Sequence, residues 1–143
     1  NIWFGCVVRG DVQSIRIGAR TNVQDGSIIH VTRGDGPTRI GSGITIGHKA
    51  LLHACTLEDD CFVGMGAIVL DHATVKSGGM LAAGALLAPG KTVPAGELWA
   101  GNPAKLFRPL KVQEAEFIPV SAENYVRLAA QYATVPPWYL PLR

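Results

Sequence analysis

The chain has 143 residues, a length that suits one domain, and 48% of them are hydrophobic, which is enough for a packed core. Glycine occurs 17 times and proline nine times, which argues against a helical bundle because both residues break helices. The formal net charge is only +2, so neither a nucleic-acid partner nor a membrane surface is indicated. No apolar stretch reaches the roughly 18 residues of a transmembrane helix.

The cysteines and the start of the chain give two further expectations. Cys6, Cys55 and Cys61 are an odd set without the spacing of a metal site, and we expect reduced thiols in a cytoplasmic protein. The chain opens at Asn1, without a methionine and directly with strand-forming residues, so we expect its first residues to be missing.

Aliphatic or aromatic anchors recur at every sixth position along most of the chain. An unbroken series of eight comprises Leu57, Val63, Val69, Val75, Leu81, Leu87, Val93 and Trp99. Two shorter series precede it, namely Ile17, Val23, Ile29 and Ile40, Ile46, Leu52. A period of six fits neither a helix nor an alternating strand, but it is typical of a hexapeptide β-solenoid. In that fold three repeats close one triangular coil, and the anchors of successive coils stack inward.

Two breaks in the period predict local departures from the coil. Ile29 and Ile40 are 11 residues apart, and the surplus lies in the turn-rich segment 31–38, which we expect to project as a loop. Leu52 and Leu57 are one residue too close, so a tightened corner is expected between them.

The end of the period divides the chain. We predict an all-β hexapeptide β-helix domain over residues 1–103 and a C-terminal extension over 104–143. Within the extension we expect an α-helix at about 121–133 that lies along the solenoid, capped by Ser121 and stopped by Pro136-Pro137.

Two of the four histidines fall where the repeat brings side chains together. His30 and His53 each follow an anchor by one residue on the same predicted face, one coil apart, so they point outward about 5 Å from each other at the backbone. Two imidazoles at that spacing can share a zinc ion. His48 follows an anchor on the preceding face and points away from them within one chain. His72 is expected at a surface corner.

A threefold assembly would reunite these histidines, because one face of each chain then meets a different face of its neighbour. His48 of one chain would complete a site begun by His30 and His53 of the next. Three neutral imidazoles leave a fourth position open for water, as in catalytic zinc sites. We therefore predict a homotrimer with metal sites at its subunit interfaces, and unrelated surface histidines are the alternative.

Polar residues nearby supply candidate catalytic groups. Gln24 follows the anchor Val23 on the face that carries His48, where it can hydrogen-bond a metal-bound hydroxide. Arg9 and Asp11 can pair across a subunit boundary, or Arg9 can hold an anionic product. Ordinary surface polarity is the alternative for each of them.

The sequence resembles the γ-class carbonic anhydrase-like family over nearly its whole length. The residues that carry the resemblance are Arg9-Gly10-Asp11, Asn22-Val23-Gln24-Asp25-Gly26, His30, Gly47-His48, His53 and the closing segments 100–105 and 121–125. The resemblance implies a left-handed β-helix trimer that binds zinc, or alternatively iron or cobalt, through His30, His48 and His53. It also implies that Tyr125 can reach the site from the terminal helix.

Two departures from the family pattern bear on activity. The best-studied family enzymes carry a glutamate directly after the Arg-x-Asp aspartate, where this chain has Val12. They also carry a proton-shuttling glutamate in the loop after the first histidine, whereas segment 32–38 offers only Asp35 as an acid. Weak turnover is compatible with both departures.

The predicted function is reversible hydration of carbon dioxide to bicarbonate through a metal-bound hydroxide, as in a zinc-dependent carbonate dehydratase, a lyase. Gln24 would orient the hydroxide, Arg9 would steady bicarbonate, and Asp11 and Tyr125 complete the candidate catalytic set. The alternatives are a hexapeptide acyltransferase or acyl-CoA thioesterase, and a metal-binding trimer with little turnover.

Overall fold

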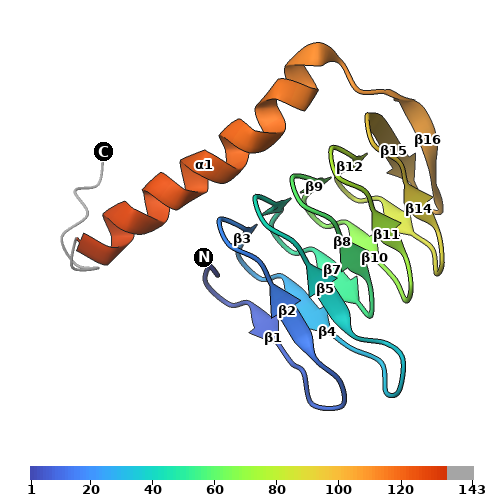
Figure 1. Cartoon of the computed structure of the whole chain (residues 1–143), viewed down its shortest axis with the longest axis horizontal. Helices are drawn as coiled ribbons and strands as arrows, with labels where there is room; N and C mark the ends of the chain where they lie inside the picture. Colours follow the sequence, from blue (N-terminus) through green and yellow to red (C-terminus); the bar gives the residue numbers. More distant parts are fainter. Residues whose placement is uncertain (135–143) are drawn as a thin grey trace.

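The computed structural model describes residues 1–134, which form a three-sided solenoid of short strands followed by one long helix (Figure 1). From β1 to β15, consecutive strands lie on different faces, and each strand from β1 to β12 pairs in parallel with the strand three positions later in the chain. This is the left-handed parallel β-helix of hexapeptide repeats that the sequence predicted.

One face, called here the histidine face, has two strands that end in histidine. It comprises β1 (Val7–Val8), β4 (Ile28–His30), β7 (Leu51–His53), β10 (Ile68–Val69) and β13 (Leu86–Leu87). Its outward column is aliphatic in every coil and consists of the register partners Val7, Ile28, Leu51, Ile68 and Leu86. Val7 is 48% exposed and Ile28 is 42% exposed, so this face presents apolar side chains to the outside.

The second face, called here the arginine face, is polar on the outside. It comprises β2 (Ile15–Ile17), β5 (Thr38–Ile40), β8 (Thr56–Leu57), β11 (Thr74–Val75) and β14 (Thr92–Val93). Its outward column consists of the register partners Arg16, Arg39, Thr56, Thr74 and Thr92. Such a column is suited to contact with water.

The third face, called here the helix face, lies beneath the C-terminal helix. It comprises β3 (Asn22–Val23), β6 (Thr45–Ile46), β9 (Phe62–Val63), β12 (Met80–Leu81), β15 (Glu97–Gly101) and β16 (Ala104–Pro109). β16 pairs antiparallel with β15 through a turn that contains the cis Asn102–Pro103 peptide. The last strand of the sheet therefore lies beyond the expected domain boundary at residue 103.

The anchors of the six-residue period fill the interior of the solenoid, as predicted. Seven of the eight anchors between residues 57 and 99 are at most 1% exposed, and Trp99 packs half-buried against the same cluster. Each fully buried aliphatic side chain contributes about 1.5–3 kcal/mol. These stacked side chains are thus the main source of cohesion between coils.

Both breaks in the period behave as the sequence predicted. The surplus residues after β4 form a loop that is closed by a 2.9 Å hydrogen bond from the Thr32 N–H to the Gly36 carbonyl. Between β7 and β8 the chain turns at Ala54, whose φ of 48° is left-handed and tightens the corner.

Helix α1 spans Val112–Thr134, so the expected range of about 121–133 was wrong at its start. The helix continues through Pro119, although that residue lacks an N–H and costs a backbone hydrogen bond. Burial of Ile118 on one side of the proline and Ala122 on the other offsets this cost. The expected stop at Pro136-Pro137 lies outside the described residues.

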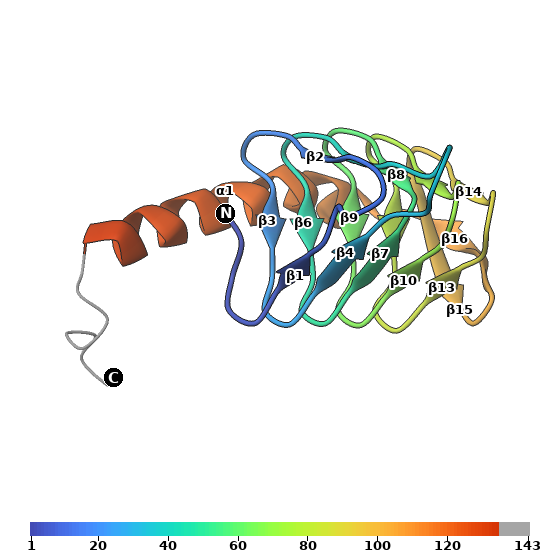
Figure 2. The same ribbon diagram turned by 90° about the horizontal axis from the view of Figure 1, so that it is seen from below.

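Ser121 is not a helix cap, because it lies within α1 and is buried. Its Oγ is 2.9 Å from Oγ1 of Thr45 on β6, and this contact fastens the helix to the solenoid. Figures 1 and 2 show α1 running from the last coils back over the helix face towards the N-terminus. Within residues 1–134, no helix combines the length and the apolar character needed to cross a membrane.

The first turn of α1 is held by Glu114. Its carboxylate accepts hydrogen bonds of 2.6 and 2.7 Å from the Arg108 guanidinium and one of 2.9 Å from the Lys111 backbone N–H. The last of these is the reach-back contact of a capping box. The Arg108 hydrogen bonds, followed by the Lys111 N–H, lower the pKa of Glu114 to about 2.

We expect Glu114→Gln to loosen the start of α1 in a pH-dependent way. The folded-state pKa lies below the ordinary value of about 4.3, so the stabilisation is complete above that value and is lost as the pH falls towards 2. Amide hydrogen exchange in the first turn should therefore be faster in the variant at pH 7, and the difference should shrink below about pH 4. Glu116→Gln at an exposed neighbouring position is the control. Equal exchange at pH 7 would contradict this account.

Candidate metal centre

His30 and His53 are register partners at the ends of β4 and β7, as the anchor count predicted. Their ring centroids are 5.1 Å apart, and Nδ1 of His30 lies 3.2 Å from Nε2 of His53. Two nitrogens that are each about 2.0–2.1 Å from a tetrahedral zinc ion are about 3.3–3.4 Å apart. The spacing of the two facing nitrogens therefore suits a shared ion.

Carboxylates occupy the opposite nitrogens of both rings. Asp71 Oδ1 lies 2.6 Å from Nδ1 of His53, and Asp11 Oδ1 lies 3.0 Å from Nε2 of His30. A neutral imidazole carries one N–H, and a carboxylate accepts it, so the facing nitrogens are left with lone pairs. Two lone pairs 3.2 Å apart cannot hydrogen-bond to each other, but both can bind one cation. The donor set therefore fits a metal ion.

The two carboxyl groups are ionised in this arrangement. The hydrogen bond with His30 is the largest influence on the pKa of Asp11 and lowers it, and Arg9 lowers it further. Burial acts to raise the pKa of Asp71, but hydrogen bonds from Thr32 and His53 outweigh it and the pKa is lowered.

His48 lies away from this pair, at the turn after β6, as predicted for a single chain. Its Nδ1 is 3.0 Å from Oδ2 of Asp25, so its Nε2 is the nitrogen left for a ligand. A Cβ added at Gly47 would come within 2.5 Å of the Met65 backbone nitrogen, so only glycine allows this turn to stack on the next coil. Gly47 thereby places His48.

Gln24 and Tyr125 meet His48 in one cavity of about 470 Å³ between the helix face and α1. Gln24 is 5% exposed, and its Nε2 donates a 3.0 Å hydrogen bond to Oδ1 of Asn22. Asn22 in turn donates a 3.0 Å hydrogen bond to Oγ1 of Thr45. This buried chain of contacts fixes Gln24 beside His48, on the face where the sequence placed it.

Tyr125 lines the same cavity from the middle of α1. Burial raises the pKa of its hydroxyl, and the nearby charge of Asp25 raises it further. The phenol therefore stays protonated at neutral pH and can donate a hydrogen bond.

Arg9 and Asp11 stand with His30 rather than with the cavity. Their side chains form an ion pair with each other inside one chain, so the pairing expected across a subunit boundary is not needed to satisfy them. One half-site thus holds His30, His53, Arg9 and Asp11, and the other holds His48, Gln24 and Tyr125. Within residues 1–134, no three metal-ligating side chains of one chain converge.

The sequence reasoning missed Asp71 as a member of the first half-site. Asp71 follows His53 by 18 residues, which is one full coil of three repeats, and this period alone could have placed it next to His53. Asp25 was part of a recognised motif but had no role assigned to it. His72, by contrast, is a left-handed corner residue 4.0 Å from the exposed Asp35, as expected of a surface histidine.

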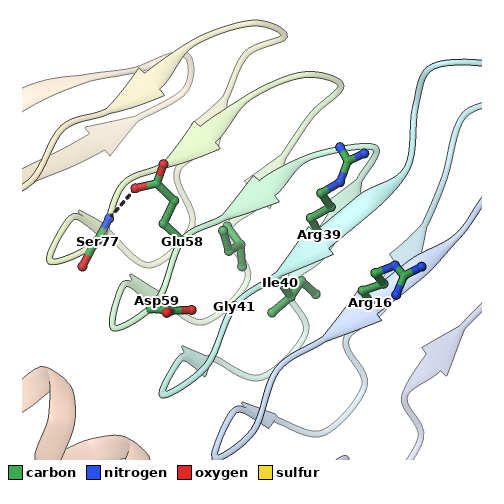
Figure 3. Close-up of a pocket in the computed structure, with 8 residues that line it drawn as sticks. Arg16, Arg39, Ile40, Gly41, Glu58, Asp59 and Ser77 are labelled. Atoms are coloured by element: carbon green, nitrogen blue, oxygen red, sulfur yellow. Dashed lines mark hydrogen bonds between the residues drawn. The ribbon is translucent and has the colours of Figure 1, made fainter.

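Two other features lie apart from these half-sites. Cys6, Cys55 and Cys61 are free thiols, and burial raises the pKa of Cys55 to about 12, which disfavours the thiolate that a metal would need. An open depression of about 490 Å³ lies on the arginine face. Figure 3 shows Arg16 and Arg39 on one side of it and Glu58 and Ser77 on the other. Its lining contains no histidine.

Comparison with known proteins places this architecture in a family. No family model matches the chain. The mitochondrial gamma carbonic anhydrase 1 of Arabidopsis thaliana is 49% identical over 93% of the chain, and a probable carbonic anhydrase of Methanocaldococcus jannaschii is 37% identical over 90%. A solved hexapeptide transferase family protein from Anaplasma phagocytophilum is 51% identical over 92% of the chain, with a TM-score of 0.88.

The protein is thus a hexapeptide-repeat β-helix with candidate histidine half-sites on two of its faces. The chain belongs to the γ-class carbonic anhydrase-like family, and this membership implies a metal cofactor. It spans 50% of the length of the plant relative, 80% of the archaeal one and 76% of the solved Anaplasma chain. The plant relative is named as mitochondrial, so the cytoplasmic location of this chain stays a prediction.

Proposed function

We propose that the chain forms a homotrimer that reversibly hydrates carbon dioxide to bicarbonate at three zinc centres. Each centre would be built from His30 and His53 of one subunit and His48 of the next. The observation that carries the proposal is the pair of facing imidazole nitrogens 3.2 Å apart, each ring having a carboxylate at its other nitrogen. Family membership supports the same chemistry.

The outward columns of the three faces support the trimer. α1 lies over the helix face, and the arginine face is polar. The histidine face carries an aliphatic column that is exposed at Val7 and Ile28 in one chain. Covering that column with a neighbour removes apolar surface from water, which is favourable by about 25 cal/mol per Å². The same contact would bring His48 of the neighbour to His30 and His53.

Zinc is the proposed metal because three neutral imidazoles suit it and leave one position open, although iron or cobalt would also accept such ligands. When bound, such an ion acts as a Lewis acid and supplies a nucleophile at neutral pH. Asp11, Asp25 and Asp71 each hold the far nitrogen of one ligand histidine and so fix its tautomer.

The remaining residues are proposed to bind and orient the reactants. Gln24, fixed by Asn22, presents a polar group in the cavity where the attacking oxygen would be held. Tyr125 offers a protonated hydroxyl on the opposite wall of that cavity. Arg9 carries the positive charge that would steady bicarbonate, while Asp11 keeps Arg9 near His30.

A metal-binding trimer with little turnover is the second candidate, and the surroundings of the first half-site favour it. Val12 stands where family enzymes have a glutamate, and Asp35 in the loop after β4 is 90% exposed and lies 4.0 Å from His72. Neither residue offers a proton shuttle close to His30. Acyl transfer has weaker support, since it would need one basic histidine rather than three ligands.

A stopped-flow hydration assay on the zinc-loaded protein tests the function. We expect measurable turnover in the unmodified protein. His48→Ala removes a candidate ligand, so it should abolish turnover. It should also lower zinc affinity by more than the 10–100-fold loss that is typical when only the hydrogen-bond partner of a ligand is changed. His72→Ala is the matched control and should leave both unchanged. Zinc binding without turnover in the unmodified protein would favour the second candidate instead.

Remixed trimers test whether each centre is shared between chains. Chains carrying His48→Ala and chains carrying His30→Ala each lack one ligand in every centre of their own trimers. In a mixed trimer, an interface that joins an intact His48 to an intact His30 and His53 should recover one zinc. If subunit exchange is confirmed but no mixing ratio recovers zinc, the shared centre is wrong.

The apolar column of the histidine face should hold the trimer together. Ile68→Asp places a charge in that column, one coil away from the candidate ligands, and we expect it to give monomers at micromolar concentration in analytical ultracentrifugation. Thr74→Asp, at an outward position of the arginine face, should leave the trimer intact. Dissociation by both variants, or by neither, would contradict this assignment of faces.

A further inference from the structure

We propose that Asp71 and Thr32 form a brace that positions His53 for the metal, an inference that rests on the proposed zinc centre. Asp71 would hold the ring of His53 in one tautomer, and Thr32 would hold Asp71. Neither residue touches the reactants, so both are positioning residues rather than catalytic ones. The brace links the loop after β4 to a candidate ligand on β7.

The brace uses both oxygens of the Asp71 carboxylate. Oδ1 lies 2.6 Å from Nδ1 of His53, and Oδ2 accepts a 2.6 Å hydrogen bond from the Thr32 hydroxyl. A carboxylate that is held at both oxygens cannot rotate away from the ring without losing a hydrogen bond. His53 is therefore held with its Nδ1 proton on Asp71 and its Nε2 lone pair towards His30.

The contact between Asp71 and His53 restricts its histidine ring more than the contact between Asp11 and His30 does. The Asp11 side chain is 43% exposed, lies 3.0 Å from the His30 ring and also pairs with Arg9. The Asp71 side chain is 31% exposed, and its carboxylate lies 2.6 Å from the His53 ring, against 3.0 Å between Asp11 and the His30 ring. A shorter and less exposed contact restricts the ring more strongly.

The loop is built so that Thr32 can reach Asp71. Val31 is 1% exposed and fixes the start of the loop, and the Thr32 N–H bonds to the Gly36 carbonyl at 2.9 Å. A Cβ at Gly36 would come within 2.5 Å of the Thr32 Cβ, so this close approach requires glycine. The loop after β4 offers no proton-shuttling acid close to His30. In this proposal it instead supplies Thr32, which holds Asp71 against His53.

Four variants of the full chain test the brace. Asp71→Asn weakens the acceptor, Thr32→Val removes only the hydroxyl, and Thr32→Ser keeps it. Asp35→Asn is the control, because Asp35 lies near His72 at 4.0 Å and contacts no candidate ligand. Zinc affinity is measured by chelator competition, and the His53 tautomer is measured by ¹⁵N NMR on metal-free protein at pH 8, where an ordinary imidazole is neutral.

We expect Asp71→Asn to weaken zinc binding by about 10–100-fold, as is typical when the partner of a ligand histidine is lost. Thr32→Val should weaken it less, whereas Thr32→Ser and Asp35→Asn should match the unmodified protein. The Nδ1–H tautomer of His53 should lose population in Asp71→Asn and Thr32→Val only. A purely structural role for these residues would not shift the tautomer.

The two readouts separate the brace from the proposed function. Unchanged zinc affinity and an unchanged tautomer in both Asp71→Asn and Thr32→Val would overturn the brace and leave the zinc centre standing. If the unmodified protein binds no zinc, the proposed function fails, and the tautomer shift in metal-free protein then decides the brace alone. Thr32→Val is nearly isosteric and keeps the test open if Asp71→Asn does not fold.

Discussion

The parallel register between coils is the constraint on which every functional placement depends. Ile29 pairs with Leu52 inside the solenoid, and the next residues, His30 and His53, are therefore partners on the outside. A slip of one residue would turn both imidazoles inward and expose two core aliphatics. Because the stacked anchors make that slip costly, the hydrophobic core also fixes the geometry of a polar site.

Three carboxylates give the histidines their directions. Asp11, Asp25 and Asp71 each contact the far nitrogen of one candidate ligand, at 2.6–3.0 Å. A ring held in this way presents a lone pair on its other nitrogen, which is the form that a metal needs. His72 lacks such a contact, because its nearest acid lies at 4.0 Å and is almost fully exposed. The contrast separates candidate ligands from an ordinary surface histidine.

The three faces of the solenoid differ in their outward surfaces. The helix face is occupied by α1, which brings Tyr125 to the cavity beside His48. The arginine face carries threonines and arginines and needs no cover. Within residues 1–134, the histidine face joins an aliphatic column, exposed at Val7 and Ile28, to a pair of candidate ligands. In the proposed trimer, a single chain would leave both this apolar surface and the metal centre incomplete. The same missing neighbour would satisfy both.

The sequence alone determined the solenoid, the stacking of His30 on His53 and the separation of His48, because a six-residue period, once its two breaks are allowed for, converts chain position directly into face and coil. It also located both breaks in the period. Only the tertiary structure decided where α1 begins, since the local cost of Pro119 is offset by burial of Ile118 and Ala122. It alone showed the link from Thr32 to Asp71, because a carboxylate's orientation depends on partners 39 residues apart in the chain.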